Sequence, residues 1–219
     1  MARTLEDVRR MIEENDVKIV DFKLTDIDGR WRHLSIPAER LTEGTMEHGI
    51  GFDGSNYGYA PVENSDMVFM PVLDSAVIDR YAEIPTLSMI GDVRVIDLPE
   101  NRPFDQYPRN VAIRALDYMK ELGIADTMLI GPEYEFYLFD RVSYEVAPQK
   151  AGYQIRARQA AFASGEEENN NGYQLSSGTG YHSCLPMDIR NDLRSNMCLS
   201  MKEWGIEVKY HHHEVGGSG

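Results

Sequence analysis

Apolar and polar residues follow first a helical and then a strand-like period at the start of the chain. Leu5, Val8 and Ile12 recur at helical spacing, and Thr4 with Asp7 gives a capping-box pattern in front of them. Two strand-like runs follow within residues 17–37 and flank the dipeptide Asp28-Gly29, which favours a tight turn. This stretch therefore predicts one amphipathic helix and then a β-hairpin.

Further strand-like runs at residues 65–78 and 85–99 complete a first region with little helix. Residues 37–48 between them read as short helix and turns. The Pro-rich stretch Pro99–Phe104 marks a candidate boundary. We therefore predict an α+β fold with two domains, residues 1–101 as a small mixed-sheet domain and residues 102–219 as the start of a second one.

The second region begins with a helix near Pro108, a favourable first-turn residue, and Gly123 ends it. Its predicted apolar face consists of Val111, Ala115, Tyr118, Met119 and Leu122. Residues 127–140 read as a buried strand pair, 164–180 as a long polar loop, and 206–215 as one more strand. A further helix is predicted from an apolar face formed by Ile189, Leu193, Met197, Met201 and Trp204.

Composition narrows the class of protein. Lys plus Arg number 22 against 36 Asp plus Glu, for a net charge of −14, which argues against binding to nucleic acid or anionic membranes. The chain begins with a charged helix and has no long apolar run, so we expect neither a signal peptide nor a membrane span. The two cysteines match no zinc or redox spacing. These features predict a cytoplasmic protein.

Two glutamates lie inside a run that otherwise looks buried. Glu133 and Glu135 are two residues apart, so on a strand they share one face at about 7 Å, while large apolar residues occupy the alternate positions. Two like charges this close repel and are costly to desolvate, and divalent cations with carboxylate ligands remove that cost. The alternative is a solvent-facing sheet side that the glutamates merely decorate.

A second cluster closes the chain in the sequence YHHHEVGGSG. On a strand, His212 and Glu214 share one face, and a His-x-Glu pair suits a metal site. The alternative is a set of packed or hydrogen-bonded histidines. The glycines that follow either let the backbone approach a ligand closely or form a flexible turn.

A third candidate is the glycine-flanked stretch GIGFDGSNYG. Asp53 in such a loop is most often a turn residue that bonds its own backbone, and nothing local makes it catalytic.

Six motifs in register resemble the type I glutamine synthetase family. GFDGSN looks like the F-D-G-S-S loop of the family, ENSDMVFMP is similar to its E-S-D-M segment, and PTLSMIGDV with YPRNVAIRA resembles the end of its first domain and the next helix. GPEYEFYLF looks like its metal-binding E-x-E strand, GTGYHSCLPMD resembles its G-G-Y-F-P-x-x-P-x-D stretch, and YHHHEVGGSG its H-H-E-V stretch.

The resemblance implies a β-grasp-like N-terminal domain and the first part of an ATP- and metal-binding catalytic α+β domain. It implies a ligase that uses ATP to join ammonia to the γ-carboxylate of L-glutamate through a γ-glutamyl phosphate, with two Mg²⁺ or Mn²⁺ ions per site. It also implies a homo-oligomer of twelve subunits with active sites between neighbours. The chain would be the N-terminal half of such a protein, and we expect this half to be inactive alone.

Residue by residue, the resemblance implies that Glu135 and Glu214 bind the metal on the glutamate side. Glu133 would bind the metal that bridges the nucleotide phosphates. Asp53 would attract ammonium and take its proton, and Tyr181 would line the ammonium pocket. The residues that bind the nucleotide base stay unassigned.

Two other functions stay open. One is a γ-glutamyl ligase for a larger amine, such as a polyamine or methylamine, because Asn56 stands where the family often has a second serine near the ammonium pocket. The other is a non-catalytic structural paralogue. The intact Glu133, Glu135 and Glu214 argue against it, because an idle site has no reason to keep repelling charges together.

Overall fold

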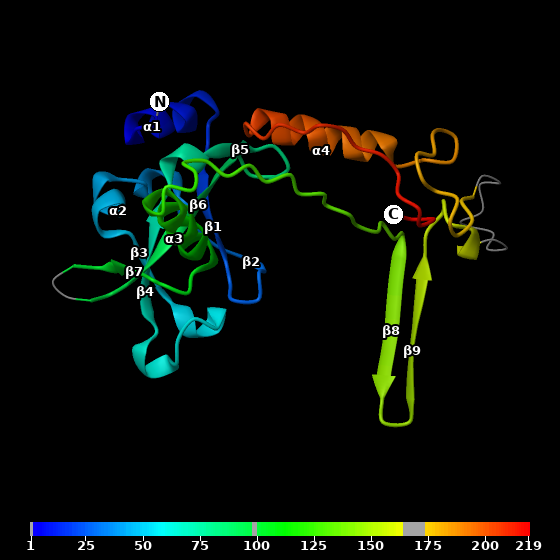
Figure 1. The fold of residues 1–219 in the computed structure, drawn as a ribbon, viewed down its shortest axis with the longest axis horizontal. Helices are drawn as coiled ribbons and strands as arrows, with labels where there is room; N and C mark the ends of the chain where they lie inside the picture. Colours follow the sequence, from blue (N-terminus) through cyan, green and yellow to red (C-terminus); the bar gives the residue numbers. More distant parts are fainter. Residues whose placement is uncertain (1, 98–99, 164–173) are drawn as a thin grey trace. The chain divides into compact units, whose positions relative to one another are not determined.

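The computed structural model describes residues 2–97, 100–163 and 174–219 (Figure 1). The chain divides into two compact units, Met1–Leu129 and Ile130–Gly219, and each is described by itself. The Pro-rich stretch Pro99–Phe104 predicted a boundary between residues 101 and 102 instead. That boundary stays a prediction, because the compact units follow spatial contacts and not sequence domains.

The first unit is built on a mixed sheet in the order β2-β1-β6-β4-β3, with β5 and β7 also paired to β6. Strand β6 runs parallel to β1 and antiparallel to β4, so it is the centre of the sheet. The strands are β1 (Ile19–Thr25), β2 (Trp31–Pro37), β3 (Ile50–Asp53), β4 (Asp66–Pro71), β5 (Val77–Asp79), β6 (Thr86–Val95) and β7 (Arg102–Pro103). The α-helices are α1 (Leu5–Glu14), α2 (Glu43–His48) and α3 (Pro108–Glu121). Short 3₁₀ turns are η1 (Ala38–Arg40), η2 (Gly54–Tyr57), η3 (Val62–Asn64) and η4 (Leu73–Ser75).

The local signals at the start of the chain are confirmed. Thr4 caps α1 in a reciprocal capping box with Asp7. Strands β1 and β2 form the predicted hairpin, and Gly29 in its turn takes the left-handed φ of 81° that favours glycine. The carboxylate of Asp26 stabilises this turn from inside, because its Oδ1 accepts the backbone N–H groups of Asp28 and Arg30 at 3.0 and 2.8 Å.

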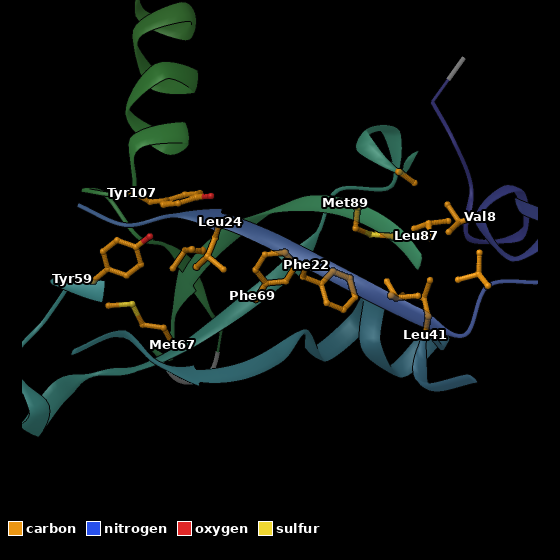
Figure 2. Packing of buried hydrophobic residues seen from close by; sticks show 14 residues of the cluster. Val8, Phe22, Leu24, Leu41, Tyr59, Met67, Phe69, Leu87, Met89 and Tyr107 are labelled. Atoms are coloured by element: carbon orange, nitrogen blue, oxygen red, sulfur yellow. The ribbon is translucent and has the colours of Figure 1, made fainter. Parts of the chain in front are cut away.

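The core of the first unit lies between α1 and the inner side chains of β1, β4 and β6 (Figure 2). Phe22 and Phe69 are fully buried, and their ring centroids lie 5.1 Å apart in a tilted arrangement. Burial of each such side chain contributes about 1.5–3 kcal/mol relative to exposure. The other buried apolar members include Val8, Val20, Leu24, Met67, Leu87, Met89 and Val93.

Helix α3 begins at Pro108 and ends before Gly123, as predicted. The predicted apolar face of this helix is not buried in the described structure, because Val111, Tyr118 and Leu122 are exposed. The helix is attached to the sheet through its start instead. Asn110 donates to the carbonyls of Val93 and Phe104 at 3.1 and 2.9 Å, so polar bonds and not an apolar stripe hold this end.

The second unit contains the long two-stranded hairpin of β8 (Arg141–Ala147) and β9 (Lys150–Arg156), the turn η5 (Ala161–Ala163) and helix α4 (Asn191–Glu203) (Figure 1). Helix α4 confirms the predicted helix, but Leu193 and Met197, two of the apolar residues that indicated it, are exposed. The buried side chains on this helix are Arg194 and Ser200, so polar groups face the rest of the unit.

Two segments predicted to form strands, a strand pair and a single strand, form none in the described structure. Residues 127–139 form no strand, and neither do residues 206–215. The first segment was also predicted to be buried, whereas Ile130 and Tyr134 are 74% and 82% exposed. A strand needs a hydrogen-bonded neighbour, and no described residue pairs with 127–137 along a ladder. The prediction was therefore wrong about burial and pairing.

Part of the predicted loop at 164–180, residues 164–173, lies outside the described residues. Among the described residues, no helix is long and apolar enough to cross a membrane.

Candidate active site

Asp53 ends strand β3 and caps the following turn η2 in the first unit. Its Oδ1 accepts the backbone N–H of Ser55 at 2.8 Å, and its Oδ2 accepts the side-chain amide of Asn56 at 3.1 Å. Hydrogen bonds from Ser55, and then from Ser65, hold the pKa of Asp53 below its usual value. The carboxylate is exposed and stays ionised at neutral pH, so it can attract a cation from solvent.

Glu214 lies in the second unit beside His212. The Nε2 atom of His212 lies 3.5 Å from Oε1 of Glu214, and its Nδ1 lies 2.9 Å from the carbonyl oxygen of His213. A carbonyl only accepts, so Nδ1 donates to it, and Nε2 is the ring nitrogen that faces the carboxylate and that carries a lone pair for a metal in the neutral ring. Two ligands of one divalent cation lie about 3–3.5 Å apart, because each ligand bond is about 2.1 Å. This donor pair therefore fits a divalent cation.

Tyr181 reaches the same place from a different part of the chain. The backbone N–H of Gly180 donates to the carbonyl of Val215 at 3.2 Å, and that of His182 donates to the carbonyl of His213 at 3.0 Å. These two bonds hold residues 180–182, called here the Tyr181 loop, along residues 213–215, called here the Glu214 segment. The Tyr181 ring then stacks on His182 at 4.1 Å and meets His212 edge-on at 5.1 Å.

Glycine at position 180 is required for this approach. A Cβ atom there would lie 2.4 Å from the carbonyl oxygen of Glu214 and 2.8 Å from that of Gly216. His182 in the same loop has a positive φ of 57°, which is uncommon for a residue other than glycine. The loop is thus held in an unusual conformation next to Glu214, as is frequent at functional sites.

Glu133 and Glu135 lie on the exposed segment before β8 and take no strand partner. Two residues after Glu135, the same segment contacts residues 216–218, which follow Glu214. Leu138 donates its backbone N–H to the carbonyl of Ser218 at 2.9 Å, and the Tyr137 ring lies so close to Gly216 that a Cβ there would be 2.8 Å from it. The glutamate pair and Glu214 are therefore carried by two segments in direct contact.

The described residues do not gather three or more His, Cys, Asp or Glu side chains into one metal-binding group. Glu133, Glu135 and Glu214 are therefore not brought together as one cluster, and their roles stay predictions. Asp53 belongs to the first unit and the other four candidates to the second.

Sequence reasoning missed a polar pocket of about 360 Å³ next to His212. Its most buried members are Asp188 and Arg194, which form an ion pair and are 2% and 8% exposed. Arg194 also points its Nε at Nδ1 of His211 at 3.4 Å. The remaining lining residues are His182, Ser183, Asn191, Tyr210 and His212. The residue that could have indicated this pocket from the sequence is Arg194, a charged residue next to the predicted apolar face of α4.

Comparison with known proteins defines the class. Residues 16–95 match the family model of the glutamine synthetase β-grasp domain, and residues 105–218 match that of the glutamine synthetase catalytic domain. The chain belongs to the glutamine synthetase family, and the resemblance drawn from its motifs is confirmed.

Individual relatives carry two different names. The chain is 40% identical to a glutamine synthetase of Haemophilus influenzae over 221 residues, which covers 100% of this chain and 46% of the relative. It is 39% identical to a 3-hydroxylaminophenol mutase of Cupriavidus pinatubonensis over 222 residues, covering 100% of this chain and 47% of the relative. The chain thus spans about half the length of these curated relatives.

A solved structure of Plasmodium falciparum glutamine synthetase matches the fold with a TM-score of 0.84 and 23% identity, covering 99% of this chain and 43% of the other. This likeness, with the match to the β-grasp domain, confirms the predicted α+β fold class.

Proposed function

We propose that the complete protein is a glutamate–ammonia ligase. It uses ATP to convert the γ-carboxylate of L-glutamate to a γ-glutamyl phosphate, from which ammonia displaces phosphate to give glutamine and ADP. The observation that carries this proposal is the pairing of the Tyr181 loop with the Glu214 segment. It joins a residue proposed to line the ammonia pocket to one proposed to bind the metal, 33 positions apart in the sequence.

Each candidate has a defined task in this reaction. The ionised carboxylate of Asp53 attracts ammonium and accepts its proton, and its lowered pKa favours attraction over strong basicity. Tyr181 lines the ammonium pocket with its ring, next to His182 and His212. The negative charge of Glu133, Glu135 and Glu214 would be balanced by two Mg²⁺ or Mn²⁺ ions.

Glu135 and Glu214 would hold one ion and Glu133 the other, and the lone pair of His212 supports the first of these. When bound, divalent cations neutralise the charge that builds up during phosphoryl transfer. The protein's part is then to position its carboxylates and to exclude misaligned substrate. We further propose a cytoplasmic homo-oligomer of twelve subunits, with Asp53 of one subunit acting beside the carboxylates of the next.

The test uses the complete purified protein with ATP, L-glutamate, ammonium and Mg²⁺. Glu135→Ala should reduce phosphate release at least about a hundredfold, because one charged ligand at the reacting centre is lost. Glu145→Ala is a matched control, since Glu145 lies on the exposed hairpin and pairs with Lys150. Near-normal turnover in Glu135→Ala would remove Glu135 from the site.

The acceptor is tested in the same assay. We expect ammonia to be a better acceptor than methylamine or putrescine, and the reverse order would favour the larger-amine ligase.

A second candidate function follows from the relative named as a mutase, which is as similar as the synthetases. Conversion of 3-hydroxylaminophenol without ATP, together with no glutamine formation, would favour that candidate.

A further inference from the structure

His213 is a polar side chain that is fully buried, whereas its two neighbours in the proposed site, His212 and Glu214, are only partly buried. Its Nδ1 lies 2.7 Å from the carbonyl oxygen of Glu214, and its Nε2 lies 3.0 Å from the side-chain amide nitrogen of Gln159. Gln159 is itself buried and is 54 positions away in the sequence. These two side chains therefore connect distant segments inside the second unit.

The hydrogen bonds assign a single tautomer to this ring. A carbonyl oxygen only accepts, so Nδ1 of His213 carries the proton and donates to Glu214. Nε2 then accepts from the amide of Gln159. His213 is thus held by one donated and one accepted hydrogen bond.

The carbonyl that His213 binds belongs to Glu214, the proposed metal ligand. Gly180 packs against the same carbonyl from its own loop and leaves no space for a side chain. The peptide of Glu214 is therefore fixed by a buried ring and by a close backbone contact. Its carboxylate then lies beside His212, with Oε2 accepting the N–H of Val215 at 3.1 Å.

We propose that His213 and Gln159 are positioning residues that hold Glu214 in its metal-binding orientation. This inference rests on the proposed role of Glu214 as a metal ligand. His213 acts through the Glu214 carbonyl, and Gln159 acts by fixing the tautomer and the plane of the His213 ring. Such outer partners change metal affinity about 10- to 100-fold when they are removed.

The test measures Mn²⁺ affinity of the complete protein by electron paramagnetic resonance of free Mn²⁺, with no substrate present. Two substitutions of similar size separate the two ring nitrogens. His213→Asn places an amide N–H near the position of Nδ1 and keeps the bond to Glu214, whereas His213→Gln places its amide near Nε2. We expect His213→Gln to weaken Mn²⁺ binding about 10- to 100-fold. His213→Asn should restore affinity to within about threefold of the original protein.

Gln159→Leu tests the second member without touching the ring. It should weaken Mn²⁺ binding by a smaller factor than His213→Gln, because the bond to Glu214 remains. Circular dichroism of every variant checks that the fold persists. If His213→Gln does not fold, Gln159→Leu and His213→Asn still decide, because each keeps the bond to Glu214 and loses the contact between Gln159 and the ring, so the inference requires both to weaken Mn²⁺ binding by a similar small factor.

Two outcomes overturn the inference in distinguishable ways. Unchanged Mn²⁺ affinity in Glu214→Ala would overturn the metal role of Glu214 and the inference with it. A large loss in Glu214→Ala combined with full affinity in His213→Gln and Gln159→Leu would overturn the positioning role alone. Ligase activity with ammonia is measured separately, so the reaction class does not affect either result.

Discussion

The two compact units differ in what fills their interiors. The first buries large apolar side chains from several strands around Phe22 and Phe69. Among described residues of the second, the buried apolar side chains are the small Ala157 and Ala160 together with Leu175, and the buried polar group is larger. It includes Gln159, Asp188, Arg194, His213 and Ser218.

This difference separates a unit with an apolar core from the unit that carries the proposed metal ligands. Apolar burial in the first unit is non-directional and tolerant of small shifts, so it stabilises a sheet. The polar interior of the second unit works only if each group finds its partner, as His213 and Arg194 do. The proposed ligand residues accordingly lie in the unit whose packing is directional, which is what fixes a carboxylate in one orientation.

The largest expected contrast is in amide hydrogen exchange of the 219-residue chain. Amides of β1, β4 and β6 should exchange at least about a thousandfold more slowly than those of an unfolded chain, because they open only with the whole sheet. Residues 127–137 donate none of the described backbone hydrogen bonds and should exchange at nearly unfolded rates. Strong protection there would mean that this segment has a strand partner, and the contrast between the units would fail.

A core substitution gives the next largest effect. Phe22→Ala removes a fully buried ring that contacts Phe69 and should lower the free energy of unfolding by about 3–5 kcal/mol. Tyr134→Ala also removes an aromatic ring, but this ring is exposed in the second unit, and we expect a change within about 0.5 kcal/mol. Urea denaturation followed by circular dichroism measures both. Equal effects of the two substitutions would show that the two regions contribute equally to the free energy of unfolding.

The smallest expected effect is a pH dependence that belongs to the first unit. Burial raises the pKa of Asp26, but hydrogen bonds from Arg30 and then from Arg32 outweigh it and hold the pKa below its usual value. The charged form is therefore favoured in the folded state. Its contribution to stability is complete above the unfolded pKa of about 4 and is lost as the pH falls through the lower folded pKa.

Asp26→Asn should therefore reduce the stability of the first unit at pH 7 and flatten the loss of stability as the pH falls below about 4. Asp28→Asn is the control, because Asp28 is exposed in the same turn. Urea midpoints measured across this pH range decide the matter. If the urea midpoint of Asp26→Asn falls with decreasing pH as steeply as that of the original protein, other carboxylates cause the loss of stability.

The sequence predicted elements well wherever the signal was local. The capping box at Thr4, the turn at Gly29, the start of α3 at Pro108 and the end of α4 before Gly205 each depend on a few neighbouring residues. Burial was predicted poorly. Residues 127–139 have the alternation of a buried strand, yet alternation says only which side chains share a face and not whether a partner covers that face.

The sequence alone therefore determined the family, the fold class and the candidate residues. Motifs and short-range structural signals depend only on residues that are close together in the sequence. Only the tertiary structure decided which distant residues meet. It laid the Tyr181 loop on the Glu214 segment and joined Gln159 to His213. Hydrogen bonds between residues 31 to 54 positions apart depend on how the whole unit folds. No periodicity in the sequence predicts these hydrogen bonds, because each one needs a single donor and a single acceptor that the rest of the chain brings together.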